Sequence, residues 1–518
     1  MIDLHLKFRH IFIFILLTTS GCGLKEKLYY AAPTLLPKTE RNMKIPGFWI
    51  SSHPFPDKEI LNQEEIKDLN FYIKHELELA KDITEFPPRF LGKALISVLS
   101  NTFNDFRKRE LYLINGWKAP SRFYQKIKEN MNINGIPFEI KVRFGFIVHY
   151  ANQRVFPTNE GLYVKPMDVN FDELQNSALD IGTPLAILHR SSDGKWFYVV
   201  SPLSSGWVEV TKVALCNLKE LSDFLNIPSF VVVTKAKGEI FLNPSLTKYY
   251  DYVRMGVRLP LYKEIDTHII QIIIPFRKKD GALLPKVAYM RKDDVHEGYL
   301  PYTARNIIHQ AFELLNVPYG WGGMYGEQDC SRFIQEVFAT VGIILPRNSS
   351  QQAQIGLLVG EFDQNSPEEK KLDLLGTKAI GGITLLYLKG HIMLFWGVIN
   401  DHPYAIHAIW AYRERVGWRS VVRVVNRVAI TDLLLGKGSK KGSLLKKINH
   451  HQNNYKLKFL SETSIRGKFK RLRSITVCQI FKDMVENRCD LYGKRYLFQK
   501  GKKRRLCCTF CLQITGSR

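Results

Sequence analysis

Polar and apolar positions change their spacing twice along this chain, and each spacing predicts a different kind of structure. From about Pro46 to Asn134 the apolar residues recur at helical intervals. Asn62, followed three places later by Glu65, has the pattern of a capped helix start. A further helical stretch runs from Phe90 to about Leu113. We therefore expect a helical packing domain over residues 46–135.

From Glu139 onward the apolar positions alternate, which is typical of half-buried strands. A hairpin-type connection ends in Asp193-Gly194, and a second Asp-Gly turn follows at Asp280-Gly281. Similar runs of short strands surround both turns, so the sequence indicates an internal repeat. We expect two small β-barrels, over residues 136–218 and 228–302, that act as binding or shaping modules.

The helical spacing returns after Thr303, a predicted N-cap, and again after Cys330. Because Phe333, Ile334 and Val337 repeat at helical intervals, Cys330 is predicted to lie in the first turn of a buried helix. The positive end of a helix stabilises a thiolate, which would lower the cysteine pKa from about 8.5 towards 7. Cys330 is therefore a candidate nucleophile.

Two histidines on predicted neighbouring strands are candidates for its general base. Residues 391–399 and 404–410 alternate as strands, and antiparallel pairing would bring His391 and His407 side by side, facing the helix of Cys330. Cysteine catalysis needs a histidine that accepts the thiol proton and a polar group that orients it. His402, in the intervening turn, is a weaker candidate for the third member.

Composition and charge limit the classes of function. The 518 residues are 45% hydrophobic and 24% charged, as in ordinary globular proteins, and the net charge is +25. Residues 450–518 hold 17 Lys and Arg against 4 Asp and Glu, so about half of the excess charge lies in this tail. We expect the tail to be solvated and poorly ordered, and we expect no specific nucleic-acid partner.

Cysteine usage argues against a disulfide scaffold and against a metal enzyme. Only three cysteines, Cys22, Cys216 and Cys330, precede the tail. The body lacks Cys-x-x-Cys and His-Glu-x-x-His patterns, so we expect no metal and no cofactor. The tail pair Cys508 and Cys511 has no matching second pair, which disfavours a zinc site there.

The first residues have the pattern of an export signal. Lys7 and Arg9 precede an apolar run, and Thr19-Ser20-Gly21-Cys22 resembles the lipobox of bacterial lipoproteins. We expect residues 1–21 to be a lipoprotein signal peptide, Cys22 to be lipidated, and 22–45 to be a linker. This resemblance implies an exported protein anchored at the cell envelope, on the periplasmic face of the outer membrane.

Five motifs in order resemble the NlpC/P60 family of papain-like bacterial cell-wall peptidases. They are Tyr319–Gly323, Asp329-Cys330-Ser331, the segment Leu345–Gln352 with Arg347 and Ser349, Gly390-His391, and Ile406-His407-Ala408. The resemblance implies that Cys330 is the nucleophile, His391 the base and His407 the orienting residue. It also implies that Tyr319, Asp329, Ser331 and Ser349 line the substrate cleft. Arg332 and Gly381-Gly382-Ile383-Thr384 depart from the family pattern.

Some members of this family carry a helical N-terminal stabilising segment and two bacterial SH3-like barrels before the peptidase. The resemblance therefore implies a multidomain chain whose papain-like α+β catalytic domain spans residues 303–449. The implied activity is hydrolysis of the bond between γ-D-glutamate and a diamino acid in peptidoglycan stem peptides, favouring muropeptides or peptides with a free N-terminus. A lipoprotein with an inactive domain acting as a muropeptide receptor, and an acyltransferase, are the alternatives.

Overall fold

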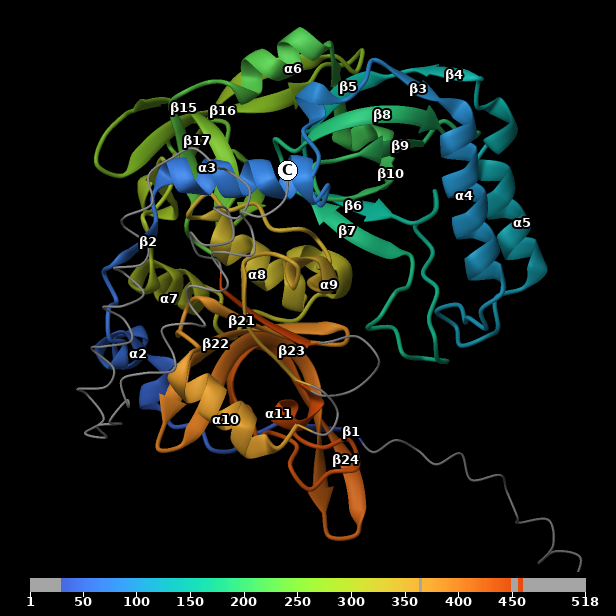
Figure 1. Ribbon diagram of the computed structural model, residues 1–518. Coiled ribbons are helices and arrows are strands. Elements are labelled where there is room, and N and C mark those ends of the chain that lie inside the picture. The colour runs from blue at the N-terminus through green and yellow to red at the C-terminus, as the bar shows by residue number, and fades with distance from the viewer. Residues whose placement is uncertain (1–28, 363–365, 449–454, 460–518) are drawn as a thin grey trace, which may run out of the picture. The chain divides into compact units, whose positions relative to one another are not determined.

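The computed structural model describes residues 29–362, 366–448 and 455–459 (Figure 1). The chain divides into two compact units, Met1–Ser464 and Ile465–Arg518. The second unit lies outside the described residues, as do Cys22, the expected signal peptide of residues 1–21 and all the tail cysteines. Within the described part, three seven-stranded sheets and two two-stranded sheets carry the architecture. None of the helices in these ranges combines the length and apolar character needed to cross a membrane.

The helical region expected over residues 46–135 is divided between two neighbours. Its helices are α2 (Pro46–Ser52), α3 (Gln63–Phe71), α4 (Gly92–Arg107) and α5 (Ser121–Asn130). The capping box of Asn62 and Glu65 opens α3, as the sequence predicts. The α4 helix ends at Arg107, six residues earlier than expected. Leu95 and Phe123 of α4 and α5 share a hydrophobic core with Trp207 of the first barrel sheet.

The beginning of the helical region packs instead on the C-terminal domain. Trp49 of α2 makes edge contacts with Trp396 and Tyr404, at ring-centroid distances of 6.3 and 5.6 Å. Short strands add two links: β2 (Glu59–Leu61) pairs with β19 (Tyr302–Thr303), and β3 (Arg89–Leu91) pairs with β4 (Glu139–Lys141). This region therefore joins the first barrel to the C-terminal domain.

Two of the seven-stranded sheets have the same strand order. The first runs β11-β5-β8-β9-β10-β6-β7, and the second, taken from its other end, runs β18-β12-β15-β16-β17-β13-β14. Numbered from the first strand of each, the two orders are identical, which agrees with the repeat indicated by the two Asp-Gly turns. The α6 helix (Leu218–Leu225) connects them, capped by Asn217 and Glu220.

The strands of the first sheet are β5 (Arg143–Ile147), β6 (Ala151–Arg154), β7 (Gln175–Leu179), β8 (Pro184–Arg190), β9 (Trp196–Val200), β10 (Ser205–Glu209) and β11 (Val213–Cys216). Those of the second are β12 (Phe230–Val233), β13 (Lys237–Phe241), β14 (Tyr249–Arg254), β15 (Arg258–Glu264), β16 (Ile269–Arg277), β17 (Leu283–Arg291) and β18 (Val295–Glu297). Each sheet buries its own apolar cluster, as small barrels do.

The third sheet belongs to the C-terminal domain and has the order β1-β24-β23-β22-β21-β25-β20. Its strands are β1 (Tyr29–Ala31), β20 (Leu357–Phe362), β21 (Thr384–Leu388), β22 (His391–Ile399), β23 (His402–Val416), β24 (Arg419–Asp432) and β25 (Tyr455–Phe459). The helices of this domain are α7 (Ala304–Glu313), α8 (Cys330–Ala339), α9 (Ser349–Gln352), α10 (Glu368–Thr377) and α11 (Leu444–Lys447). The α8 helix lies against β22 and β23 (Figure 1).

Two expected boundaries differ from the structure. Strand β1 lies in the range expected to be a linker, where it pairs in parallel with β24. Strand β25 lies in the range expected to be a poorly ordered tail, where it pairs with β20 and β21. Both segments are too short to show a clear alternating pattern, so only the partner strands reveal them.

Candidate active site

The α8 helix begins at Cys330, with Asp329 as its N-cap. The Asp329 side chain accepts a hydrogen bond from the backbone N–H of Arg332 at 2.8 Å, which satisfies one of the free donors of the first turn. Cys330 is a free cysteine and is 8% exposed. The helix start thus holds the thiol in a fixed, nearly enclosed position.

A buried network surrounds the Asp329 carboxylate. Arg347 Nη2 lies 2.6 Å from Asp329 Oδ2, and the Ser331 hydroxyl donates to Oδ1 at 3.0 Å. The backbone N–H of Gly322 donates to Oδ2 at 3.1 Å. Burial by itself raises the pKa of Asp329, but Arg347 and these donors outweigh it and hold the pKa below its usual value. Asp329 and Ser331 are both buried, so in this structure they brace the helix start.

The pKa of the Cys330 thiol is raised to about 12, first by burial and then by the neighbouring Asp329 carboxylate. Hydrogen bonds from the backbone N–H groups of Ile392 and Ser331, and the charge of Arg347, oppose the shift without cancelling it. The expectation that the helix end would lower this pKa towards 7 is therefore wrong for this state. Desolvation and an adjacent anion outweigh the helix dipole here.

Two histidines and a threonine form a hydrogen-bonded chain across β22, β23 and β24. His391 Nε2 lies 2.6 Å from His407 Nδ1, and His407 Nε2 lies 2.9 Å from Thr431 Oγ1. The residue after His391, Ile392, donates its backbone N–H to the Cys330 sulfur. The start of β22, which carries His391, therefore contacts the thiol through its backbone, and His407 lies against His391 on the next strand.

Both imidazoles are held neutral. Burial and then the charge of Lys447 lower the pKa of His391 to about 4, although Asp329 acts in the opposite direction. Burial and then His391 hold the pKa of His407 well below its usual value. His391 is half-buried and His407 is fully buried, and each ring disfavours protonation of the other, so both are neutral at physiological pH.

The weaker candidate, His402, lies at the other end of the same strands. It pairs in register with Ile399, the last residue of β22, whereas His391 is the first. Its Nδ1 is 2.7 Å from Asp432 Oδ2. His402 thus has its own partner, and His407 is the histidine that contacts His391.

The remaining predicted cleft residues lie in two places. Tyr319 is half-buried, with its ring centroid 6.1 Å from Trp410 and 6.3 Å from Phe171. Burial, then Asp329 and Cys330, raise the pKa of its phenol well above the usual value. Ser349 opens α9, and Gln352 of the same helix donates to the backbone carbonyl of Ser331 at 2.9 Å.

Both barrels reach this site through buried charges. Asp180, after β7, contacts Arg254 of β14 at 2.8 Å and Arg332 of α8 at 2.6 Å. Arg332 also lies 2.7 Å from Glu336 on the next turn. Arg332 departs from the family pattern noted in the sequence, and the structure gives the reason: its guanidinium joins the helix of Cys330 to both barrels.

Sequence reasoning missed Thr431, Asp180, Arg254 and Lys447. Each lies far along the chain from the motif residue that it supports, and nothing in the local pattern of β24 distinguishes Thr431. The unusual arginine at position 332 was the available signal for a buried acidic partner.

In the part of the chain that the structure describes, no three His, Cys, Asp or Glu side chains come together as metal ligands.

Two segments of the chain match known domain families. Residues 316–394 match the NlpC/P60 family, and residues 162–209 match an SH3 domain of the SH3b1 type. The first match includes Cys330 and His391.

Two curated relatives are both named gamma-D-glutamyl-L-lysine dipeptidyl-peptidase. The one from Bacillus cereus is 29% identical over 206 residues, which cover 37% of this chain and 57% of the relative. The one from Bacillus subtilis is 29% identical over 100 residues, covering 18% of this chain and 34% of the relative. The chain thus spans little more than half of the first relative and about a third of the second.

One solved structure resembles most of the fold. It is described as a novel NlpC/P60 endopeptidase from Photobacterium damselae subsp. piscicida, with a TM-score of 0.65 and 23% identity. The similarity covers 79% of this chain and 96% of that one. At this identity the likeness concerns the fold. Taken with the two matched segments, these findings show that the chain combines an SH3 domain of the SH3b1 type with a papain-like domain of the NlpC/P60 family.

Proposed function

We propose that the protein is a cysteine peptidase that hydrolyses the γ-D-glutamyl to diamino-acid bond of peptidoglycan stem peptides. The observation that carries this proposal is the hydrogen-bonded chain His391, His407 and Thr431, whose first member precedes the residue that donates its backbone N–H to the buried Cys330 thiol. The printed names of the two Bacillus relatives support the choice of bond. A nucleophile, a base and an orienting group in this order are the parts that acyl transfer to sulfur requires.

The proton positions follow from the hydrogen-bonded chain. If His391 Nε2–H donates to His407 Nδ1, and His407 Nε2–H donates to Thr431 Oγ1, each contact has one donor and one acceptor. This arrangement leaves His391 Nδ1 without a proton. The unprotonated Nδ1 atom is then the proposed base, and His407 fixes its tautomer.

In the proposed reaction the Cys330 sulfur attacks the scissile carbonyl while its proton passes to His391 Nδ1. The tetrahedral intermediate collapses to a thioester, and the amine of the diamino acid leaves with the proton from His391. Water then adds to the thioester as His391 accepts its proton, and the thiol is restored when the γ-glutamyl carboxylate departs. Because the resting groups are a neutral thiol and a neutral imidazole, the proton moves during the attack.

Product analysis tests this proposal. The full chain and its Cys330→Ala variant are incubated with a stem peptide that contains the γ-D-glutamyl to diamino-acid bond, in water enriched in ¹⁸O. Hydrolysis predicts a new amine and a γ-glutamyl product with ¹⁸O in its carboxylate, both absent with Cys330→Ala. Intact peptide that binds without cleavage would indicate the receptor function, and acyl products without ¹⁸O would indicate a transferase.

We further propose that the protein is exported and lipid-anchored through Cys22. The support is the lipobox-like sequence Thr19-Ser20-Gly21-Cys22 and the cell-wall substrate proposed above. Metabolic labelling with an alkyne fatty acid tests the anchor. Label and membrane association are predicted for the full chain, and loss of both for Cys22→Ala, whereas a labelled Cys22→Ala protein would contradict the anchor.

A further inference from the structure

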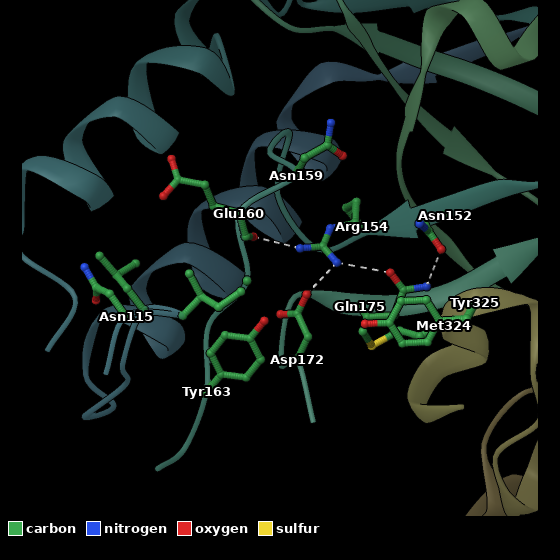
Figure 2. A pocket seen from close by; sticks show the side chains of 13 residues that line it. Asn115, Asn152, Arg154, Asn159, Glu160, Tyr163, Asp172, Gln175, Met324 and Tyr325 are labelled. Atoms are coloured by element: carbon green, nitrogen blue, oxygen red, sulfur yellow. Dashed lines mark hydrogen bonds and ion pairs between the residues drawn. The ribbon is translucent and has the colours of Figure 1, made fainter. Parts of the chain in front are cut away.

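A polar pocket lies on the first barrel, next to the loop whose Gly322 contacts Asp329 of the candidate active site. It has a volume of about 420 Å³, and the first barrel sheet, the turn before α5 and the loop Trp321–Gly326 form its walls (Figure 2). None of Cys330, His391 or His407 lines it. We propose that this pocket binds a neutral saccharide unit of the peptidoglycan glycan strand, an inference that rests on the proposed function for the identity of the polymer.

The floor of the pocket is neutral because its charges pair internally. Arg154 is only 5% exposed, and its Nη1 lies 2.7 Å from Asp172 Oδ2 and 3.1 Å from Gln175 Oε1 (Figure 2). Its Nη2 donates to the backbone carbonyl of Glu160 at 2.8 Å. A guanidinium already engaged in this way offers little to a carboxylate or phosphate, so the floor favours an uncharged ligand.

Amide groups around the floor present donors to the pocket. In the described part of the chain, the Asn115 and Asn152 side chains form hydrogen bonds only through their carbonyl oxygens. Asn115 Oδ1 accepts from the backbone N–H of Trp117 at 3.0 Å, and Asn152 Oδ1 accepts from Gln175 Nε2 at 3.0 Å. Both NH2 groups therefore remain as donors, and the exposed carboxylate of Glu160 adds acceptors. Sugar hydroxyls and N-acetyl groups need this mixture of donors and acceptors.

Tyr325 displays its ring at the mouth of the pocket. The side chain is 79% exposed, and its backbone has φ of +60°, a conformation that is unfavourable for a bulky residue. The Tyr150 hydroxyl holds this loop by donating to Gly323 O at 2.6 Å and accepting from Gly326 N at 3.1 Å. A flat ring held towards solvent beside amide groups suits the apolar face of a pyranose.

The loop after residue 170 separates this pocket from the thiol. Phe171 turns towards the site, with its ring centroid 5.4 Å from Trp321, whereas Asp172 and Gln175 line the pocket. The Trp321 indole donates to the Asp172 carbonyl at 3.1 Å, and Gln175 Nε2 donates to Gly322 O at 3.2 Å. Sugar and peptide parts of one muropeptide could thus occupy opposite sides of one loop.

Calorimetric titration tests the proposal with an N-acetylglucosamine oligomer, which contains no peptide. The protein is the full chain carrying Cys330→Ala. Tyr325→Ala removes the exposed ring, and Asn115→Asp keeps the acceptor for Trp117 N while it removes the NH2 donor. Trp418→Ala is the matched control, because this ring is 96% exposed and lies between β23 and β24, away from the pocket.

Saturable binding is predicted, with a Kd raised about tenfold or more by Tyr325→Ala and by Asn115→Asp, and unchanged by Trp418→Ala. Absence of binding, or binding that neither pocket substitution weakens, would overturn the proposal. The proposal would also be overturned if the protein bound a free stem peptide but not the oligomer, and if Tyr325→Ala abolished that peptide binding. Because the oligomer has no scissile peptide bond, it can bind even if the peptidase proposal fails. Likewise, the stem peptide can be hydrolysed even if the oligomer does not bind.

Discussion

His391 Nε2 and His407 Nδ1 lie 2.6 Å apart, and the second imidazole is fixed in turn by Thr431 at 2.9 Å. In the proposed mechanism His407 therefore acts on the thiol only through His391. Thr431 is one step further away, on β24, and lies outside the segment that matches the NlpC/P60 family.

Replacing Thr431 with valine keeps the shape of the side chain but removes its hydroxyl. We expect kcat to fall about tenfold with little change in KM, because the tautomer of His407 loses its acceptor, whereas His407→Ala should cost about 100-fold or more. Steady-state kinetics on a defined stem peptide measure both. His402→Gln is the control, since His402 pairs with Asp432 at the far end of the strands. An unchanged kcat in Thr431→Val would show that the hydroxyl does not orient His407.

The pH dependence of kcat/KM reports the protonation of His391. Its pKa is lowered to about 4, so the imidazole stays neutral and able to accept a proton as the pH falls below the usual histidine value near 6.5. We expect the acidic limb of the profile to lie near pH 4. A limb near pH 6.5 would mean that His391 titrates like a solvated histidine. A substrate that does not ionise in this range is required for the measurement.

Thiol alkylation measures the resting state of Cys330. With its pKa raised to about 12, only a small fraction is thiolate at neutral pH, and reaction with iodoacetamide should be slow and should rise steadily up to pH 10. Peptide mapping by mass spectrometry follows this cysteine separately from Cys216, whose pKa burial also raises to about 12. A rate for Cys330 that levels off near pH 7 would instead show a preformed thiolate.

The buried charges between the barrels and α8 should contribute strongly to stability. Asp180→Asn removes one of the two buried carboxylates that Arg254 and Arg332 share, the other being Glu336, and breaking a buried pair costs about 3 kcal/mol or more of the free energy of unfolding. Urea denaturation measures this loss. Asp223→Asn, which breaks the exposed pair with Lys219, is the control and should change stability by less than about 1 kcal/mol. Equal effects of the two substitutions would argue against the network.

Local sequence signals predicted the elements that carry the site, but not the contacts between distant segments. The helix start at Cys330 and the strand start at His391 follow from apolar spacing and agree with α8 and β22. The raised pKa of Cys330 could not be predicted from the helix start, because it depends on burial and on a carboxylate held by Arg347. Strands β1 and β25 were missed because pairing partners far along the chain create them.

Capture of the acyl-enzyme tests the nucleophile most directly. Intact-protein mass spectrometry after rapid mixing with a stem peptide, followed by acid quench, should show a mass increase equal to the γ-glutamyl part, and peptide mapping should place it on Cys330. Cys330→Ala should show neither the adduct nor the released diamino acid. Release of the diamino acid by Cys330→Ala, or an adduct on another residue, would contradict the proposed role of Cys330.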